Sequence, residues 1–203
     1  MIGPLCDGPP ARPTQKTAPR FSGAVPFSGG LRANDPAAIF RRIRAEYGLP
    51  LRGDHGVVHW ARVLQNGLRI ADATGADAEV VTLFALFHDS RRIGAGEDAG
   101  HGRRGAEFAR ALRGELVFLE DDRFELLCDA CRLHTDGLTD GDPTLRACWD
   151  ADRLDLGRVG IVPHRKKLCT DAARELLGWA HARAVRRHEP TAVLAAWGLP
   201  AGR

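Results

Sequence analysis

The 203-residue sequence has no apolar run long enough to cross a membrane. Its densest apolar stretch, residues 80–87, is far shorter than the roughly 20 residues that a transmembrane helix needs. The N-terminus also lacks the basic start and the apolar core of about 7–15 residues that are typical of a secretory leader. We therefore expect no membrane partner, and the odd number of cysteines, five, favours the reducing environment of the cytoplasm.

The sequence also contains few lysines. Only three of the 29 basic residues are lysines, and the net charge is +3. Basic residues cluster only at 164–167, whereas proteins that bind nucleic acids usually carry a segregated basic face, often with interleaved aromatic residues. We therefore expect no nucleic-acid partner, although arginine-rich chains still attract small ligands that carry phosphate groups.

The composition is that of a globular protein of ordinary size. Hydrophobic residues make up 44% of the chain and charged residues 27%. Residues 1–33 contain six of the 12 prolines and no hydrophobic period. We predict that this segment is a disordered tail and that residues 34–203 form a single domain, because the length suits one hydrophobic core.

Apolar residues recur at helical spacing, and strand-like alternation is nearly absent, so we predict an all-α fold. Helix starts are marked by Asp35-Pro36 and Asp142-Pro143, where an acidic cap precedes proline in the first helical position. The seven to eight predicted helices cover residues 36–47, 54–74, 78–89, 102–113, 121–134, 143–156, 170–187 and 190–197. The third of these is apolar almost all round, which predicts a central, buried helix.

His88 and Asp89 directly follow the apolar residues of this central helix. A carboxylate buried there without a partner would cost several kcal/mol, and a bound cation would supply the partner. His59 shares a helical stripe with Val63 and Ile70, so its side chain is expected to point inward as well. These three residues are therefore candidate metal ligands.

Asp152 is the best further carboxylate. It aligns at helical spacing with the apolar residues of its predicted helix, whereas Asp150 is expected to turn toward Arg146 and Arg153. With the three residues above, Asp152 completes a set of two imidazoles and two carboxylates. Such a mixed set suits Mn²⁺, Fe²⁺, Co²⁺, Ni²⁺ or Zn²⁺ better than Ca²⁺.

Cysteines suggest a different metal site. Cys128 and Cys131, followed by His134, have part of the spacing of a structural zinc site. The segment is predicted to be helical, however, and a fourth ligand such as Cys148 would come from a distant turn. We therefore interpret these cysteines as buried thiols.

The order of the histidines and aspartates resembles the HD-domain superfamily of metal-dependent phosphohydrolases. The resemblance extends over about residues 50–160 and rests on His59 with Arg62 and Val63, the His88-Asp89 doublet, His101, His134, and Asp152-Arg-Leu-Asp. It implies an HD-domain helical bundle in which His59, His88, Asp89 and Asp152 hold one metal ion. By order, His101 and His134 match residues that in some branches hold a second ion or contact the scissile phosphate.

The resemblance also implies an activity. Hydrolysis of a small phosphate ester or a nucleotide would use a metal-activated water that Asp89 can orient, with one or two divalent ions as cofactor. Arg91 and Arg92 directly follow the doublet and are expected to contact the substrate phosphate, as is His55. Arg103 and Arg104, beside His101, are further candidates, and the glycine-rich segment 94–102 can form a rim or a lid.

Two departures leave the substrate open. The Glu-Asp pair of guanosine tetraphosphate hydrolases and the Gly-Tyr-Pro signature of the cyclic-dinucleotide branch are both missing from this sequence. The native metal and the oligomeric state stay open too. Two other functions remain: a di-iron oxygenase on the same fold, and a catalytically idle module that binds a nucleotide or a partner protein. The complete ligand set disfavours the idle module.

Overall fold

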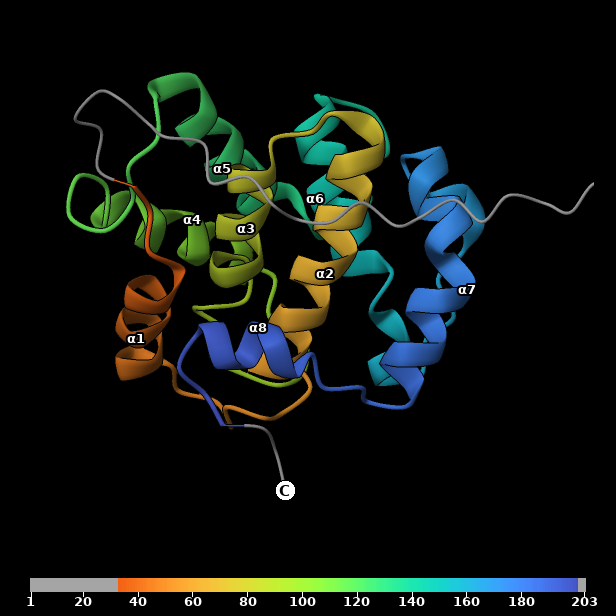
Figure 1. Ribbon diagram of the computed structural model, residues 1–203, viewed down its shortest axis with the longest axis horizontal. Helices are drawn as coiled ribbons and strands as arrows, with labels where there is room; N and C mark the ends of the chain where they lie inside the picture. The colour runs from red at the N-terminus through yellow and green to blue at the C-terminus, as the bar shows by residue number, and fades with distance from the viewer. Residues whose placement is uncertain (1–32, 201–203) are drawn as a thin grey trace, which may run out of the picture. The chain divides into compact units, whose positions relative to one another are not determined.

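The computed structural model describes residues 33–200, and within this range the chain is all-α, as predicted (Figure 1). The predicted tail, 1–33, lies outside the described residues except for its last position. The helices of the described part are α1 (Pro36–Glu46), α2 (Val57–Thr74), α3 (Ala78–Phe87), α4 (His101–Ala111), α5 (Asp121–Leu133), α6 (Pro143–Arg153), α7 (Asp171–Val185) and α8 (Thr191–Ala196), with short 3₁₀ helices η1 (Leu156–Val159) and η2 (Arg165–Lys167). None of these helices has the length and apolar character that a bilayer crossing requires.

Acidic caps start several helices where the sequence predicts them. The carboxylate of Asp35 accepts a hydrogen bond from the N–H of Ala37, and Asp142 does the same for Thr144. Each cap precedes a proline, whose missing N–H costs nothing in the first turn of a helix. Local sequence chemistry therefore sets these N-termini.

The second helix begins later than predicted. It starts at Val57 and not at 54, because the Val57 N–H bonds the carbonyl of Leu51 at 2.8 Å and closes a tight turn over residues 51–56. A Cβ added at Gly56 would overlap that carbonyl, so the turn requires glycine. As a result, His55 lies in the turn that precedes α2 and not on the helix itself.

Two other helices end earlier than predicted. Helix α3 ends at Phe87, and the hydroxyl of Ser90 bonds the Phe87 carbonyl at 2.8 Å, so that His88 and Asp89 lie in a tight turn. Helix α6 ends at Arg153 because the following residues adopt the closer 3₁₀ pattern of η1. Both endings place polar side chains at the buried centre of the bundle.

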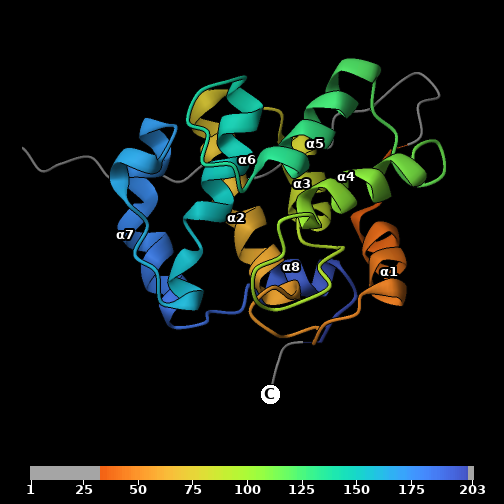
Figure 2. The ribbon, with the colours of Figure 1, turned by 180° about the vertical axis from the view of Figure 1, so that it is seen from behind.

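Helix α3 is central and buried, as its apolar sequence predicts. It contacts α1, α2, α4, α5 and α6, and its apolar residues from Val80 to Phe87 are buried. The long connection from α3 to α4 is visible from behind in Figure 2. The turn that carries His88 and Asp89 thus lies where five helices meet.

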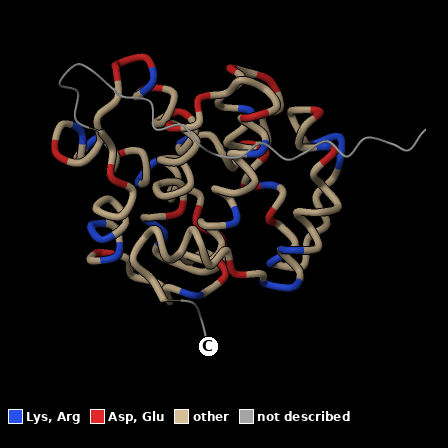
Figure 3. The backbone as a smooth tube through the Cα atoms, viewed as in Figure 1, with Lys and Arg blue, Asp and Glu red and all other residues tan. Residues whose placement is uncertain are grey.

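Charged residues are mixed along the described backbone and are not segregated by sign (Figure 3). Many of them form ion pairs, for example Arg110 with Glu125 at 2.7 Å and Arg123 with Asp77 at 2.6 Å.

Candidate metal centre

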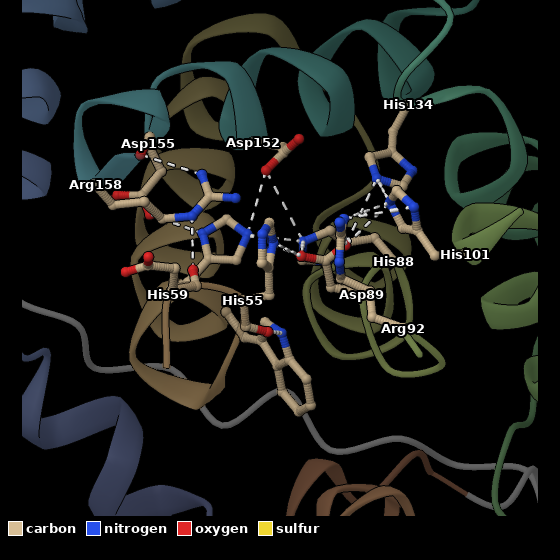
Figure 4. Close-up of polar contacts among 12 residues, drawn as sticks. His55, His59, His88, Asp89, Arg92, His101, His134, Asp152, Asp155 and Arg158 are labelled. Carbon is tan, nitrogen blue, oxygen red and sulfur yellow. Dashed lines mark hydrogen bonds and ion pairs between the residues drawn. The ribbon is translucent and has the colours of Figure 1, made fainter. Parts of the chain in front are cut away.

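Two groups of buried side chains meet at the turn after α3 (Figure 4). We call His59, His88 and Asp89 the first trio, and Asp89, His101 and His134 the second trio. In each trio the potential ligand atoms lie within 4.8 Å of one another, and all five side chains are buried. Asp89 belongs to both trios, so the two groups form one continuous cluster.

The first trio has a contact that a bound cation would satisfy. Nε2 of His59 and Nε2 of His88 lie 3.1 Å apart. On each ring the other nitrogen already faces an acceptor: His59 Nδ1 lies 2.7 Å from the Asp155 carboxylate, and His88 Nδ1 lies 3.1 Å from the Phe84 carbonyl. In neutral rings with Nδ1 protonated, both Nε2 atoms carry lone pairs, and two facing lone pairs repel unless a positive ion attracts both.

The protonation state of His88 supports this assignment. Burial of the ring lowers the pKa of His88 to about 3, even though the nearby charges of Asp89 and Asp152 act to raise it. His88 is therefore neutral at physiological pH, which is the form that binds metals.

Asp152, the further carboxylate of the sequence analysis, lies beside the first trio. Its Oδ1 atom lies 3.3 Å from His59 Nε2 and 3.9 Å from His88 Nε2. That oxygen is buried and has no hydrogen-bond partner among the described residues. Burial acts to raise the pKa of Asp152, but the adjacent rings of His59 and His88 lower it well below its usual range. An ionised, buried oxygen without a donor needs a cation.

The second trio repeats the pattern on the other oxygen of Asp89. His101 and His134 place their Nε2 atoms 2.9 Å apart, and their Nδ1 atoms face the backbone carbonyls of Asp98 and Cys131. Nε2 of His101 lies 3.1 Å from Asp89 Oδ1, and that of His134 lies 3.9 Å away. Metal-ligating histidines usually donate their second N–H in this way.

The two histidines of the second trio differ in their affinity for protons. Burial lowers the pKa of His134. Burial also acts to lower the pKa of His101, but the hydrogen bond and charge of Asp89 raise it above its ordinary value. A proton on His101 Nε2 or a metal ion can therefore satisfy Asp89 Oδ1, and the two compete for the same place.

The residues present fit divalent ions. Four imidazole nitrogens and the oxygens of Asp89 and Asp152 form a mixed nitrogen and oxygen donor set, and the unpartnered Asp152 oxygen and the paired Nε2 atoms both call for positive charge. The cluster could hold one ion at each trio, with Asp89 between them. This arrangement can polarise a phosphate ester and activate water.

A carboxylate behind His59 was not predicted as functional. Asp155 Oδ2 binds His59 Nδ1, and the same carboxylate receives the Arg62 guanidinium through contacts of 2.6 and 3.0 Å. Burial acts to raise the pKa of Asp155, but His59 and Arg62 lower it overall, so the residue is ionised. Asp155 lies three residues after Asp152, and this helical spacing was the signal that could have identified it.

Two of the residues expected to contact the substrate phosphate, His55 and Arg92, lie against the cluster. His55 Nδ1 lies 3.0 Å from Asp89 Oδ2, and Tyr47 and Trp60 each donate a hydrogen bond of 2.8 Å to the His55 carbonyl. The buried guanidinium of Arg92 places Nη1 3.4 Å from Asp89 Oδ1 and 3.3 Å from a ring nitrogen of His101. Its other nitrogens bond the carbonyls of the loop that follows, at Gly94 and Gly96.

The structure does not bring the other predicted arginines to the cluster. Arg91 pairs with Glu46 and lies over the Phe108 ring, 3.7 Å from its centroid, because consecutive residues of the turn point in opposite directions. Arg103 pairs with Glu107 on the surface, and Arg104 binds the Asp98 carboxylate. Of the arginines expected at the phosphate, Arg92 alone contacts either trio.

The sequence analysis expected Asp150 to turn toward Arg146 and Arg153, but in the structure it binds other groups. It is fully buried and accepts hydrogen bonds of 2.7–2.8 Å from the N–H groups of Cys169 and Thr170 and from the Thr170 hydroxyl. Nη1 of Arg153 stays 4.0 Å away. Asp150 therefore anchors the start of α7, which explains why an inward carboxylate at this position is not a ligand of the cluster.

The cysteines of the described residues behave as buried thiols. Cys128, Cys131, Cys148 and Cys169 are free and buried. Burial raises the pKa of Cys128 and of Cys169 to about 11, so these thiols stay protonated. Within residues 33–200, the two trios are the groups with the geometry of a metal site, and neither includes a cysteine. His134 faces the carbonyl of Cys131 and not its sulfur.

Comparisons with known proteins agree with this geometry. The family model described as HD domain matches residues 56–157, half of the chain. The crystal structure of a predicted HD superfamily hydrolase from an uncultured Thermotogales bacterium is similar, with a TM-score of 0.56 and 27% identity over 80% of this chain and 91% of that chain. No curated protein matches the chain. The matched range contains both trios, Asp152 and Asp155, and ends before Arg158.

Proposed function

The chain belongs to the HD-domain family, whose members include metal-dependent phosphohydrolases, and we propose that it hydrolyses a small phosphate ester or a nucleotide. The observation that carries this proposal is the convergence of four imidazole Nε2 atoms on the two oxygens of one carboxylate, Asp89. The unpartnered oxygen of Asp152 beside them supports it. Such a donor set serves little purpose without cations.

We assign the metal ligands by trio. His59, His88, Asp89 and Asp152 would hold one ion, and Asp89, His101 and His134 would hold a second. Mn²⁺, Fe²⁺, Co²⁺, Ni²⁺ and Zn²⁺ all suit these donors. When bound, a divalent ion supplies Lewis acidity toward a phosphoryl oxygen and makes water acidic enough to ionise, near neutral pH, to the hydroxide that attacks phosphorus.

Of the carboxylates in the cluster, Asp152 is better placed than Asp89 to orient the attacking water. Asp89 was expected to orient the attacking water, but its Oδ1 faces His101 and Arg92, and its Oδ2 faces His55. Asp152 is less enclosed, with a side chain that is 15% exposed against 2% for Asp89. We therefore assign the orientation of the water, through a hydrogen bond that its carboxylate accepts, to Asp152.

Arg92 and His55 are positioned to contact the substrate. Nη1 of Arg92 faces the second trio, where a guanidinium can bind phosphoryl oxygens and stabilise the charge that develops on them. His55 is 13% exposed, and its Nε2 has no hydrogen-bond partner among the described residues. That nitrogen can hold or release a proton beside the leaving oxygen.

Elemental analysis combined with an activity screen tests the proposal. We expect purified protein to bind Mn²⁺, Ni²⁺ or Co²⁺ and to release phosphate from at least one member of a panel of nucleotides and phosphate esters. Asp89→Ala removes the carboxylate that both trios share, so it should lose bound metal and turnover together. Asp129→Ala, at an exposed surface ion pair with Arg132, is the matched control and should retain both.

Two results would contradict the proposal. Retained activity in Asp89→Ala would mean that chemistry does not occur at this cluster. Tight nucleotide binding without turnover in the metal-loaded protein would indicate the regulatory module and not a hydrolase.

A second candidate, a di-iron oxygenase, is favoured by one observation. Asp89 presents one oxygen to each trio, an arrangement that suits paired irons as well as paired hydrolytic ions. Oxygen consumption by the iron-loaded protein in the presence of reductant distinguishes the two functions. We expect none beyond the background of free iron.

A further inference from the structure

Arg158 lies next to the cluster but outside the range matched by the HD-domain family model. It belongs to η1, directly after α6. Asp152, Asp155 and Arg158 follow one another at intervals of three residues, which places their side chains on one side of this helical segment. Figure 4 shows Arg158 at one end of the labelled group, beside Asp155, and Arg92 on the other side of Asp152, toward His101.

The guanidinium of Arg158 is held in place by backbone carbonyls. Nε donates to the carbonyl of Asp54 at 2.8 Å, and Nη1 donates to the carbonyl of Asp155 at 3.2 Å. The side chain is only 5% exposed. Two anchors on a planar group fix its orientation, so the position of the third nitrogen is determined as well.

That third nitrogen, Nη2, is available. It has no hydrogen-bond partner among the described residues, and it is not one of their buried polar atoms that lack a partner, so it retains access to solvent. Arg158 therefore presents a fixed, charged donor at the edge of the cluster. Such a donor is suited to an oxyanion.

The positive charge of Arg158 is also poorly compensated. Among the described residues, the one carboxylate within ion-pair range is Asp155, 3.9 Å from Nε. The same carboxylate already binds Arg62 at 2.6 Å and His59 at 2.7 Å. A largely buried guanidinium that shares its nearest counter-charge with two other groups favours the arrival of a further anion.

The charges of the whole cluster favour a highly anionic ligand. The three carboxylates of Asp89, Asp152 and Asp155 balance three guanidinium groups, those of Arg62, Arg92 and Arg158. Each divalent ion would then add two positive charges. Arg158 lies on the side of the first trio and Arg92 contacts the second, so two anionic groups of one ligand can be bound at the same time.

We propose that Arg158 is a substrate-binding residue whose Nη2 holds a phosphoryl oxygen beside the first trio, while Arg92 holds another beside the second. The substrate would therefore carry two or more linked phosphoryl groups, as nucleoside polyphosphates do. This inference rests on the proposed function, because it assumes that both trios are loaded with metal and face a phosphate ester.

Calorimetric titration of the metal-loaded protein with pyrophosphate and with orthophosphate tests this assignment. We expect pyrophosphate to bind more tightly than orthophosphate. Arg158→Gln should weaken pyrophosphate binding by about 10–100-fold, the range for loss of a charge-assisted hydrogen bond, and should affect orthophosphate less. Metal content is measured after each titration, because pyrophosphate also chelates metals.

Two further variants keep the test decisive. Arg165→Gln removes the same charge from an exposed position and should bind both anions like the wild-type protein. Arg158→Lys retains the charge but lacks the planar group that reaches both carbonyls, so pyrophosphate affinity should lie between those of the wild-type protein and Arg158→Gln. If Arg158→Gln fails to fold, Arg158→Lys gives the result.

The outcomes separate the two proposals. Wild-type pyrophosphate affinity in the folded, metal-loaded Arg158 variants would overturn the role of Arg158 and leave the hydrolase proposal intact. Equal affinity of the wild-type protein for the two anions would overturn the inferred substrate class. Absence of bound metal in the wild-type protein would overturn both proposals.

Discussion

The first and second trios share Asp89 but are held by different parts of the fold. His59 lies in the first turn of α2 and is fixed by the Asp155 carboxylate, which Arg62 binds in turn. His101 lies at the start of α4 and His134 at the end of α5, and the Nδ1 atoms of both rings face backbone carbonyls and not a carboxylate. A buried, ionised partner makes an imidazole a stronger ligand than a carbonyl does, so we expect the first trio to bind its ion more tightly.

Loss of a ligand from one trio should produce the largest difference between them. His59→Ala should weaken metal binding at the first trio by more than about 100-fold, since loss of even an outer partner costs 10–100-fold. His134→Ala should remove one ion and leave the tighter one bound. Metal stoichiometry measured by elemental analysis after dialysis against a weak chelator checks this, and loss of both ions from His134→Ala would contradict the ranking.

The Asp155 carboxylate should matter to one trio alone. Asp155→Asn keeps an oxygen near His59 Nδ1 but removes the negative charge, so affinity at the first trio should fall by about 10–100-fold. The buried guanidinium of Arg62 also loses its partner, which should destabilise the fold by about 3–5 kcal/mol. Competition with a chromophoric chelator measures the affinity, and denaturant unfolding measures the stability. An equal loss at the second trio would show that the two are not independent.

The second trio depends on the close approach of α4 to α5. A Cβ added at Gly102 would overlap the Cys131 carbonyl and touch the His134 ring. Gly102→Val should therefore displace His101 from His134, weaken the second ion and destabilise the protein by about 1–3 kcal/mol.

A matched control exists in another helix. Gly178 lies in α7 with open space where its Cβ would be, so Gly178→Ala should stabilise the protein by about 0.5–1 kcal/mol and leave metal content unchanged. Unaltered second-ion binding in Gly102→Val would mean that helix contact does not position this trio.

The smallest predicted effect is on stability and concerns Asp77, which caps the N-terminus of α3; Asp89 follows the C-terminus of the same helix. Burial acts to raise the pKa of Asp77, but hydrogen bonds from Arg123 and from the Val80 N–H lower it below the ordinary value of 3.8. Because the pKa is lower in the folded state, Asp77 contributes stability above about pH 4, and this contribution is lost as the pH falls through the folded-state value.

Asp77→Ala should therefore cost about 1 kcal/mol at pH 7, the usual value of a lost helix cap, with no loss of metal. The difference from the wild-type protein should shrink in urea titrations below pH 4. A difference that persists unchanged in acid would assign the effect to packing and not to the ionised cap.

Much of the fold and part of the site could be predicted from local sequence. Helical spacing gave the eight helices, and the apolar sequence of α3 predicted its central place. The first trio and Asp152 could be proposed because histidine and aspartate on apolar stripes need a partner wherever they are buried. Asp155 and Arg158 were overlooked because their roles depend on neighbours that are distant in sequence, such as His59 and Asp54.

The amino-acid sequence by itself determined where helices start, since a cap and a proline act on their own backbone, and which residue types are available as ligands. Tertiary packing decided which of two adjacent arginines, Arg91 or Arg92, faces the cluster, and what Asp150 binds instead of it. The physical reason is that a side chain one position along a turn points elsewhere, and only the contacts among α2, α3, α4, α5 and α6 bring residues up to 96 positions apart within hydrogen-bond range.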